Sequence, residues 1–154
     1  MKLRTILLVV LGCMATANLC FADDPNLGTW KLNEAKSTIG AGAPKFTTVV
    51  YEPTGDSVKI TVDGVDGAGK PVHTEWTGKF DGKDYPVNGD PTADTRAYRR
   101  SNDTTLTFTA KKGTKVVNNG RVVVAADGKS RTVTQTGTNP NGQKFSATSF
   151  YDKQ

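Results

Sequence analysis

Period-two alternation of apolar and polar residues is the feature that most restricts how this chain can fold. In residues 57–63, valine and isoleucine alternate with lysine, threonine and aspartate. The same alternation, with aromatic residues at apolar positions, recurs in 71–80 and 104–111. Successive side chains of a β-strand point to opposite faces, so each segment would have one apolar and one polar face. The pattern predicts half-buried strands.

Turn-forming residues separate these segments at short intervals. Asp, Asn, Pro and Gly cluster at 53–56, 63–69, 81–83, 127–129 and 139–142. These residue types favour tight turns because they tolerate turn backbone angles or bond to their own backbone. The predicted strands span about 28–33, 45–52, 57–63, 71–80, 84–88, 94–101, 104–111, 114–125, 130–138 and 143–151. A bulge or bend is predicted inside the eighth of these, at Asn118-Asn119-Gly120.

Little of the chain is available for helix. Residues 33–36 could form one helical turn, which the glycine-rich stretch 40–44 would end. Strands joined in sequence by short turns predict an antiparallel meander, and closure into a barrel removes its exposed edges. We therefore expect an all-β fold, an antiparallel up-and-down β-barrel of about eight to ten strands. A two-sheet sandwich is the alternative.

The N-terminus has the pattern of an export signal. Lys2 and Arg4 precede the apolar run Ile6–Leu11, and small residues follow between 15 and 22. A charged start, a short apolar core and a small-residue exit are typical of a signal peptide. The apolar run is far shorter than the ~20 residues of a membrane-spanning helix. We therefore expect residues 1–22 to be a signal peptide and expect no transmembrane segment.

Two cleavage positions are plausible, after Ala17 or after Ala22, and the second leaves 23–154 as a single barrel domain. Val10–Cys13 loosely resembles a bacterial lipobox, so lipid anchoring is an alternative. The expected location is outside the cytoplasm, in the periplasm or secreted.

Cysteine and charge exclude further classes of protein. Both cysteines precede residue 23, so the domain 23–154 would hold no disulfide and would depend on packing. The whole chain has 20 basic and 15 acidic residues, and without Lys2 and Arg4 the basic count is 18. This modest excess is not the charge of a nucleic-acid-binding surface. No nucleic-acid partner is expected, and the sequence identifies no protein partner.

No recognisable catalytic or metal-binding set occurs. His73 is the single histidine, and alternation places it beside Glu75 on the polar face, away from Trp76. A catalytic triad or a histidine-based zinc site needs partners that the sequence does not offer. Asp63 and Asp66 lack the spacing of a calcium-binding loop. We expect a protein without catalysis, metal or cofactor.

The opening strand carries a resemblance to known barrels. Gly28-Thr29-Trp30 resembles the Gly-x-Trp opening of the calycins, the group of lipocalins, fatty-acid-binding proteins and avidins. In those families the tryptophan plugs one end of the barrel, which implies the same role for Trp30. Lipocalins set a late arginine against this tryptophan, and Arg131 is the candidate here.

Nearly the whole domain also resembles small exported bacterial lipocalin-like proteins, which bring no established activity. The similar segments are Gly28–Ser37, Val58–Gly69, Lys79–Gly89, Asp94–Arg100 and Gly128–Thr138. The chain departs from fatty-acid-binding proteins because 34–44 is too short for their helical pair, and its last strand lacks their Arg-x-Tyr. It also lacks the biotin-contacting set of avidins. The resemblance implies a fold and no particular ligand.

One cluster suggests a binding site. Alternation places Arg96, Tyr98 and Arg100 on one face of their strand. If this face lines the barrel interior, two guanidinium groups beside a phenol would suit an anionic or amphiphilic ligand. The alternative is that the arginines face solvent beside Lys111, Lys112 and Lys115, as a basic edge.

We expect an exported barrel that binds a small apolar or amphiphilic ligand in its interior without catalysis. Trp76, Tyr98 and Phe108 would form the apolar wall, with Arg96 or Arg100 as the polar contact. The alternative is a solid barrel that acts as an envelope accessory, or as an inhibitor or interaction module for another protein. A carrier needs a void of some hundreds of Å³, whereas an interaction protein needs an exposed apolar patch.

Overall fold

The computed structural model describes residues 24–154, and all of their regular secondary structure is β-strand. The ten strands are β1 (Gly28–Ile39), β2 (Lys45–Thr54), β3 (Ser57–Val65), β4 (Pro71–Gly78), β5 (Tyr85–Asn88), β6 (Thr95–Asn102), β7 (Thr105–Lys112), β8 (Lys115–Val124), β9 (Ser130–Thr138) and β10 (Lys144–Lys153). The signal peptide predicted at 1–22 lies outside the described residues. The part of the chain that is described contains no helix that could cross a membrane.

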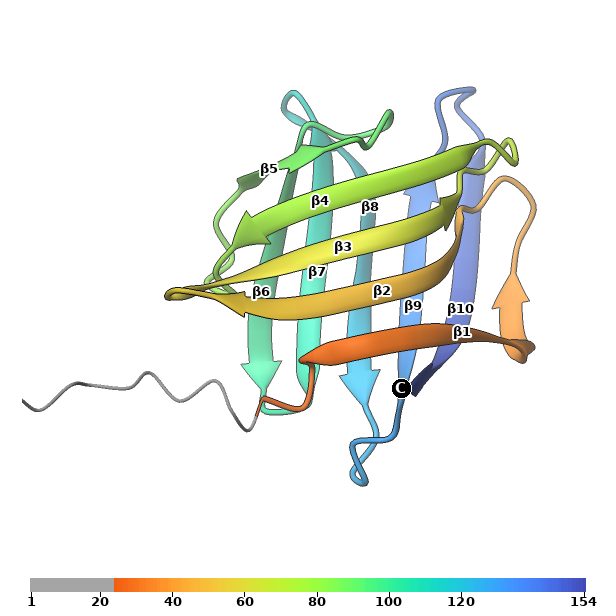
Figure 1. The fold of residues 1–154 in the computed structure, drawn as a ribbon. Helices are drawn as coiled ribbons and strands as arrows, with labels where there is room; N and C mark the ends of the chain where they lie inside the picture. Colours follow the sequence, from red (N-terminus) through yellow and green to blue (C-terminus); the bar gives the residue numbers. More distant parts are fainter. Residues whose placement is uncertain (1–23) are drawn as a thin grey trace, which may run out of the picture.

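The strands form a closed up-and-down barrel (Figure 1). Each strand pairs antiparallel with the next, and β1 closes the barrel by pairing with β10. Closure leaves neither terminal strand with an open edge, which is a common solution for a long meander. The predicted all-β barrel is confirmed, and the sandwich alternative is wrong.

The single helical turn predicted at residues 33–36 is wrong, because these residues belong to β1 and a bulge occupies residues 34–37. Asn33 pairs with Phe150, but the next residue of β1 that pairs with β10 is Thr38. Ser37 holds the bulge: its hydroxyl donates to the Asn33 carbonyl at 2.7 Å and accepts the Phe150 amide at 2.9 Å. The local turn is therefore built with side-chain hydrogen bonds inside a strand.

A bulge also occurs in β8, just before the predicted position. Ala110 pairs with Asn118, whereas Lys111 pairs with Val116, which leaves Val117 as the additional residue. Val116 is exposed, and Val117 turns toward the barrel interior. The bulge therefore changes which residues of β8 face inward.

One end of the barrel is closed by Trp30. Its side chain is fully buried, and its indole Nε1 donates to the Asn26 carbonyl at 2.9 Å. The Arg131 guanidinium lies 4.6 Å from the centre of the indole ring. The contact between Trp30 and Arg131 that the calycin resemblance implies is therefore present.

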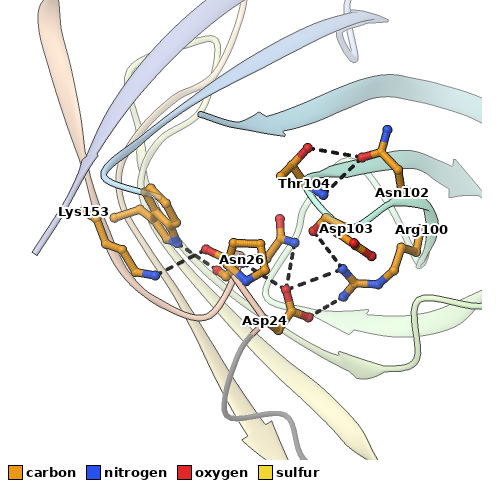
Figure 2. A network of polar contacts seen from close by, with 9 residues as sticks. Asp24, Asn26, Arg100, Asn102, Asp103, Thr104 and Lys153 are labelled. Carbon is orange, nitrogen blue, oxygen red and sulfur yellow. Dashed lines mark hydrogen bonds and ion pairs between the residues drawn. The ribbon is translucent and has the colours of Figure 1, made fainter. Parts of the chain in front are cut away.

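The segment before β1 reinforces this closed end (Figure 2). Asp24 accepts from the Asn26 side chain at 2.9 Å and forms an ion pair with Arg100 of β6. On the other side, Lys153 of β10 donates to the Pro25 carbonyl at 3.3 Å. The first described residues thus bridge opposite walls of the barrel beneath Trp30.

Candidate functional site

The end opposite Trp30 is hollow. Four connections surround it, namely those between β1 and β2, β3 and β4, β5 and β6, and β9 and β10. These connections lie in the upper part of Figure 1. They enclose a cavity of about 500 Å³, which we call the mouth cavity. The barrel is therefore shaped like a cup with one closed end.

The walls of the mouth cavity are largely apolar. The apolar side chains from the strands are Phe46, Val72, Ala110, Val117 and Phe145, and the connections add Ala68 and prolines 44, 91 and 140. The strand residues come from β2, β4, β7, β8 and β10, because alternation turns one side chain in two inward. Such walls suit an apolar surface of a ligand.

A buried ion pair lines the mouth cavity. Arg96 donates to Asp90 at 2.9 Å, and their side chains are only 8% and 9% exposed. The other carboxylate oxygen of Asp90 accepts the amide and hydroxyl of Thr92 at 2.8 and 2.7 Å. Burial lowers the pKa of Arg96, but Tyr98 and Asp90 outweigh it and the pKa is raised. The pair carries two opposite charges and is neutral as a unit.

Two polar atoms beside this pair have no partner within residues 24–154. They are the Nε donor of Arg96 and the Oδ1 acceptor of Asn118, and both residues line the mouth cavity. Asn118 is held in place because its amide nitrogen donates to Gln135 at 3.0 Å. Buried polar atoms without partners cost free energy, so a ligand that bonds to them would gain from doing so.

The predicted aromatic wall lies deeper than the mouth cavity. Trp76 is 2% exposed and packs edge-on against Tyr98 with 4.8 Å between ring centres, and its Nε1 donates to the Arg96 carbonyl at 2.8 Å. Tyr98 and Phe108 line a separate cavity of about 40 Å³, together with Arg96. Trp76, Arg96, Tyr98 and Phe108 are thus neighbours, and only Arg96 lines the mouth cavity. Their binding roles stay predictions.

Arg100 lies at the other end of the barrel. It is ion-paired with Asp24, donates to the Asp103 carbonyl at 3.3 Å and lies over the Phe80 ring at 5.1 Å. Figure 2 shows it among the residues of the closed end. Arg96 and Arg100 therefore share an inward face, as predicted, but they are not brought together in one site.

The solvent-facing alternative is wrong for Arg96, which is 6% exposed. Two of the three lysines proposed for a basic edge pair with carboxylates. Lys111 contacts Asp84 at 2.7 Å, and Lys112 contacts Asp94 at 2.7 Å.

Sequence reasoning missed most of the mouth cavity. Asp90 lies in the connection between β5 and β6, and nothing in the sequence indicates that it pairs with the buried Arg96 six residues later. Phe46 and Phe145 line this cavity, and nothing in the sequence distinguishes them from the aromatic residues of the core. Val117 could not be assigned to a face, because the β8 bulge interrupts the alternation.

His73 lies on the outer face, as alternation predicted, and contacts Asp63 at 2.6 Å. Its side chain is 59% exposed, so it is remote from the barrel interior. Over residues 24–154, no group of three or more histidine, cysteine, aspartate or glutamate side chains is placed to hold a metal ion.

Comparison with known proteins identifies no family for this chain. No family model matches the chain, and no curated protein matches it. A solved structure, that of EF1p2_mFAP2b bound to DFHBI, has a TM-score of 0.49 with this chain at 10% sequence identity. The similarity covers 84% of this chain and 94% of that chain. The assignment as a barrel rests on the strand pairing of the chain itself.

Proposed function

We propose that the protein is an exported, non-catalytic binding protein that takes one small molecule into the mouth cavity. The observation that carries this proposal is a void of about 500 Å³ at one end of a barrel whose other end is closed. Sites for small molecules are typically clefts of about 300–1,000 Å³ with apolar walls and a few polar groups. Export is supported by the sequence of residues 1–22 alone.

The cavity surface favours an apolar or amphiphilic ligand. Phe46, Val117 and Phe145 offer apolar contact, whereas Arg96 and Asn118 offer one free donor and one free acceptor. Because Asp90 already balances the charge of Arg96, a hydroxyl or amide group is the polar end that best fits these two atoms.

The alternative, an interaction module with a solid barrel, has less support. A solid barrel has no void of this size, whereas an interaction surface needs an apolar patch. The exposed large apolar side chains among residues 24–154 are Val116, at 47%, and Val123, at 36%. Two valines are too few for such a patch.

Neighbouring valines of β8 provide a matched test. Val117 lines the mouth cavity and Val116 faces solvent, so the larger side chain of Val117→Trp occupies part of the cavity and that of Val116→Trp does not. The neutral fluorophore N-phenylnaphthylamine serves as the test ligand because its emission rises in apolar surroundings. We expect it to bind the wild type and Val116→Trp equally, and Val117→Trp at least about tenfold more weakly. Equal binding by all three proteins would refute the proposal.

The natural ligand is best sought by native mass spectrometry of the protein purified from its exported form. We expect additional mass that is lost on denaturation. The mass of the denatured chain also distinguishes cleavage after Ala17 from cleavage after Ala22.

A further inference from the structure

A second cavity lies inside the barrel, between the mouth cavity and Trp30. Its volume is about 40 Å³, and we call it the inner cavity. Its polar lining is Arg96, Arg131, Asn118, Gln135, Tyr51, Tyr98 and Tyr151. A single water needs roughly 10–15 Å³ on the same measure, so the inner cavity has room for a small ion with little else.

Arg131 brings an unbalanced charge to the inner cavity. It is 2% exposed and forms no ion pair with any residue from 24 to 154, and its Nε and Nη1 have no hydrogen-bond partner there. The rings of Trp30, Tyr51 and Tyr151 surround its guanidinium at 4.6, 4.8 and 5.1 Å. Aromatic faces attract the cation but supply no acceptor for these N–H groups.

The other polar groups of the inner cavity do not supply the missing negative charge. Arg96 adds a further unpartnered donor, Nε, while its own charge is balanced by Asp90. Burial raises the pKa of Tyr51 above its usual value and that of Tyr151 to about 12. Both tyrosines are therefore neutral at neutral pH. Within residues 24–154, the inner cavity holds one net positive charge, three N–H donor nitrogens without partners and one acceptor without a partner, Asn118 Oδ1.

We propose that the inner cavity binds one small monovalent anion between Arg131 and Arg96. An anion would accept hydrogen bonds from these donors and would offset the cost of burying an unpaired charge. Two sources of this chemistry fit, a free halide ion or the carboxylate of a molecule whose apolar part lies in the mouth cavity. The proposal does not require a ligand in the mouth cavity, because it rests on a different void and on the charge of Arg131, which does not line the mouth cavity. Arg96 lines both cavities.

Bromide is the direct test, because its anomalous X-ray scattering distinguishes it from water. We expect crystals of the wild type grown with sodium bromide to show an anomalous peak within hydrogen-bonding distance of Arg131 Nε. Water in that position, an empty inner cavity, or bromide at the protein surface only would each overturn the proposal.

A solution measurement provides a second test with a matched control. Bromide replaces gluconate at constant ionic strength, and the midpoint of thermal unfolding is followed. An ion that binds only the folded state raises this midpoint as its concentration rises. We expect the rise in the wild type and in the exposed variant Arg121→Gln, and none in Arg131→Gln. Equal rises in all three proteins would overturn the proposal, and the crystal test stands if Arg131→Gln does not fold.

Decanoate, a carboxylate with an apolar tail, distinguishes the two sources. Loss of the bromide peak on adding decanoate supports the carboxylate of an amphiphile, and persistence of the peak supports a free halide. Both outcomes keep the anion site. A bromide peak in a protein that fails to bind N-phenylnaphthylamine would refute the mouth-cavity proposal alone.

Discussion

The side chain of Trp30 connects its own strand, β1, with β9 and with the segment before β1. It contacts Arg131 from β9, bonds to Asn26 before β1 and is itself fully buried. Trp30→Ala would remove this packing and leave a cavity at the closed end. We expect a loss of about 3–5 kcal/mol in the free energy of unfolding, measured with urea.

Trp30→Phe serves as the control, because it keeps an aromatic face over Arg131 and loses only part of the volume. It should cost clearly less than Trp30→Ala. An unchanged unfolding midpoint in Trp30→Ala would show that Trp30 does not seal the barrel.

Tyr151 predicts how stability depends on alkaline pH. Burial raises the pKa of its hydroxyl from 10.0 to about 12. Between these values the unfolded chain loses a proton that the folded chain keeps, so stability falls as the pH rises. Two pKa units correspond to roughly 3 kcal/mol, lost in full above pH 12. Tyr51, whose pKa burial also raises, contributes in the same direction.

Urea unfolding at a series of pH values from 9 to 11 tests this prediction, with Tyr151→Phe as the comparison. The variant loses the hydrogen bond from the hydroxyl to the Phe46 carbonyl, so it should be less stable at pH 9. Its stability should nevertheless fall less steeply than that of the wild type above pH 10. Parallel pH dependences in the two proteins would contradict the assignment.

The sequence predicts well which side chains of a strand face inward. It predicts poorly which residues those side chains contact. Alternation identified Arg96, Tyr98 and Arg100 as one face, because the period of a strand is local. It could not show that Arg96 pairs with Asp90 while Arg100 pairs with Asp24, 76 residues away. Such pairings depend on the register and closure of the barrel.

At the scale of elements, the connection between β5 and β6 lies very close to the backbone of β4. Gly89 has a φ of +76°, and a Cβ there would lie 2.1 Å from the His73 carbonyl oxygen. Gly128, in the connection between β8 and β9, has a similar φ of +69° but open space around it.

These two glycines separate backbone strain from steric overlap. Gly128→Ala should lower the free energy of unfolding by about 1 kcal/mol, because alanine is strained only by the left-handed backbone conformation. Gly89→Ala should cost about 3–4 kcal/mol, because the connection must also move away from β4. Urea unfolding measures the free energy of unfolding of both variants. Equal losses of stability would show that the connection between β5 and β6 moves away from β4 at little cost.

Bulges limit what can be predicted about elements. Strands of eight or more residues with uninterrupted alternation, such as β7, can be located from the sequence. In such strands the packing of one face and the strand propensity of the residues favour the same structure. Residues 34–37 and Val117 interrupt the alternation, and their conformations depend on β10 and β7 across the sheet. The prediction of a helical turn at residues 33–36 was wrong because the polar residues of this segment are compatible with both a helical turn and a bulge.

At the scale of the whole molecule, closure of β1 on β10 makes every strand depend on two neighbours. The buried residues also form one continuous cluster, from Trp30 to Val124 and Tyr151. We expect residues 24–154 to unfold in one cooperative step. Far-ultraviolet circular dichroism, which reports on strands, and tryptophan fluorescence should give the same urea midpoint. Separate midpoints would show that part of the wall opens independently.

The barrel architecture could be predicted from the sequence because turns and alternation recur along the whole domain. The cup shape could not, because it depends on which end Trp30 and Asn26 fill and on how far the rim connections extend. The aromatic residues predicted to bind a ligand lie between the closed end and the mouth cavity, where they form part of the core.

The closing pair of strands also places the two ends of the described chain side by side. The Gln154 amide donates to the Thr29 carbonyl at 3.0 Å, and Lys153 reaches Pro25, all at the end away from the mouth cavity. A reporter domain or a surface linker attached at either Asp24 or Gln154 would therefore leave the opening unobstructed. The same orientation is available from both ends, so the protein can be immobilised through either end with the mouth cavity facing the solution.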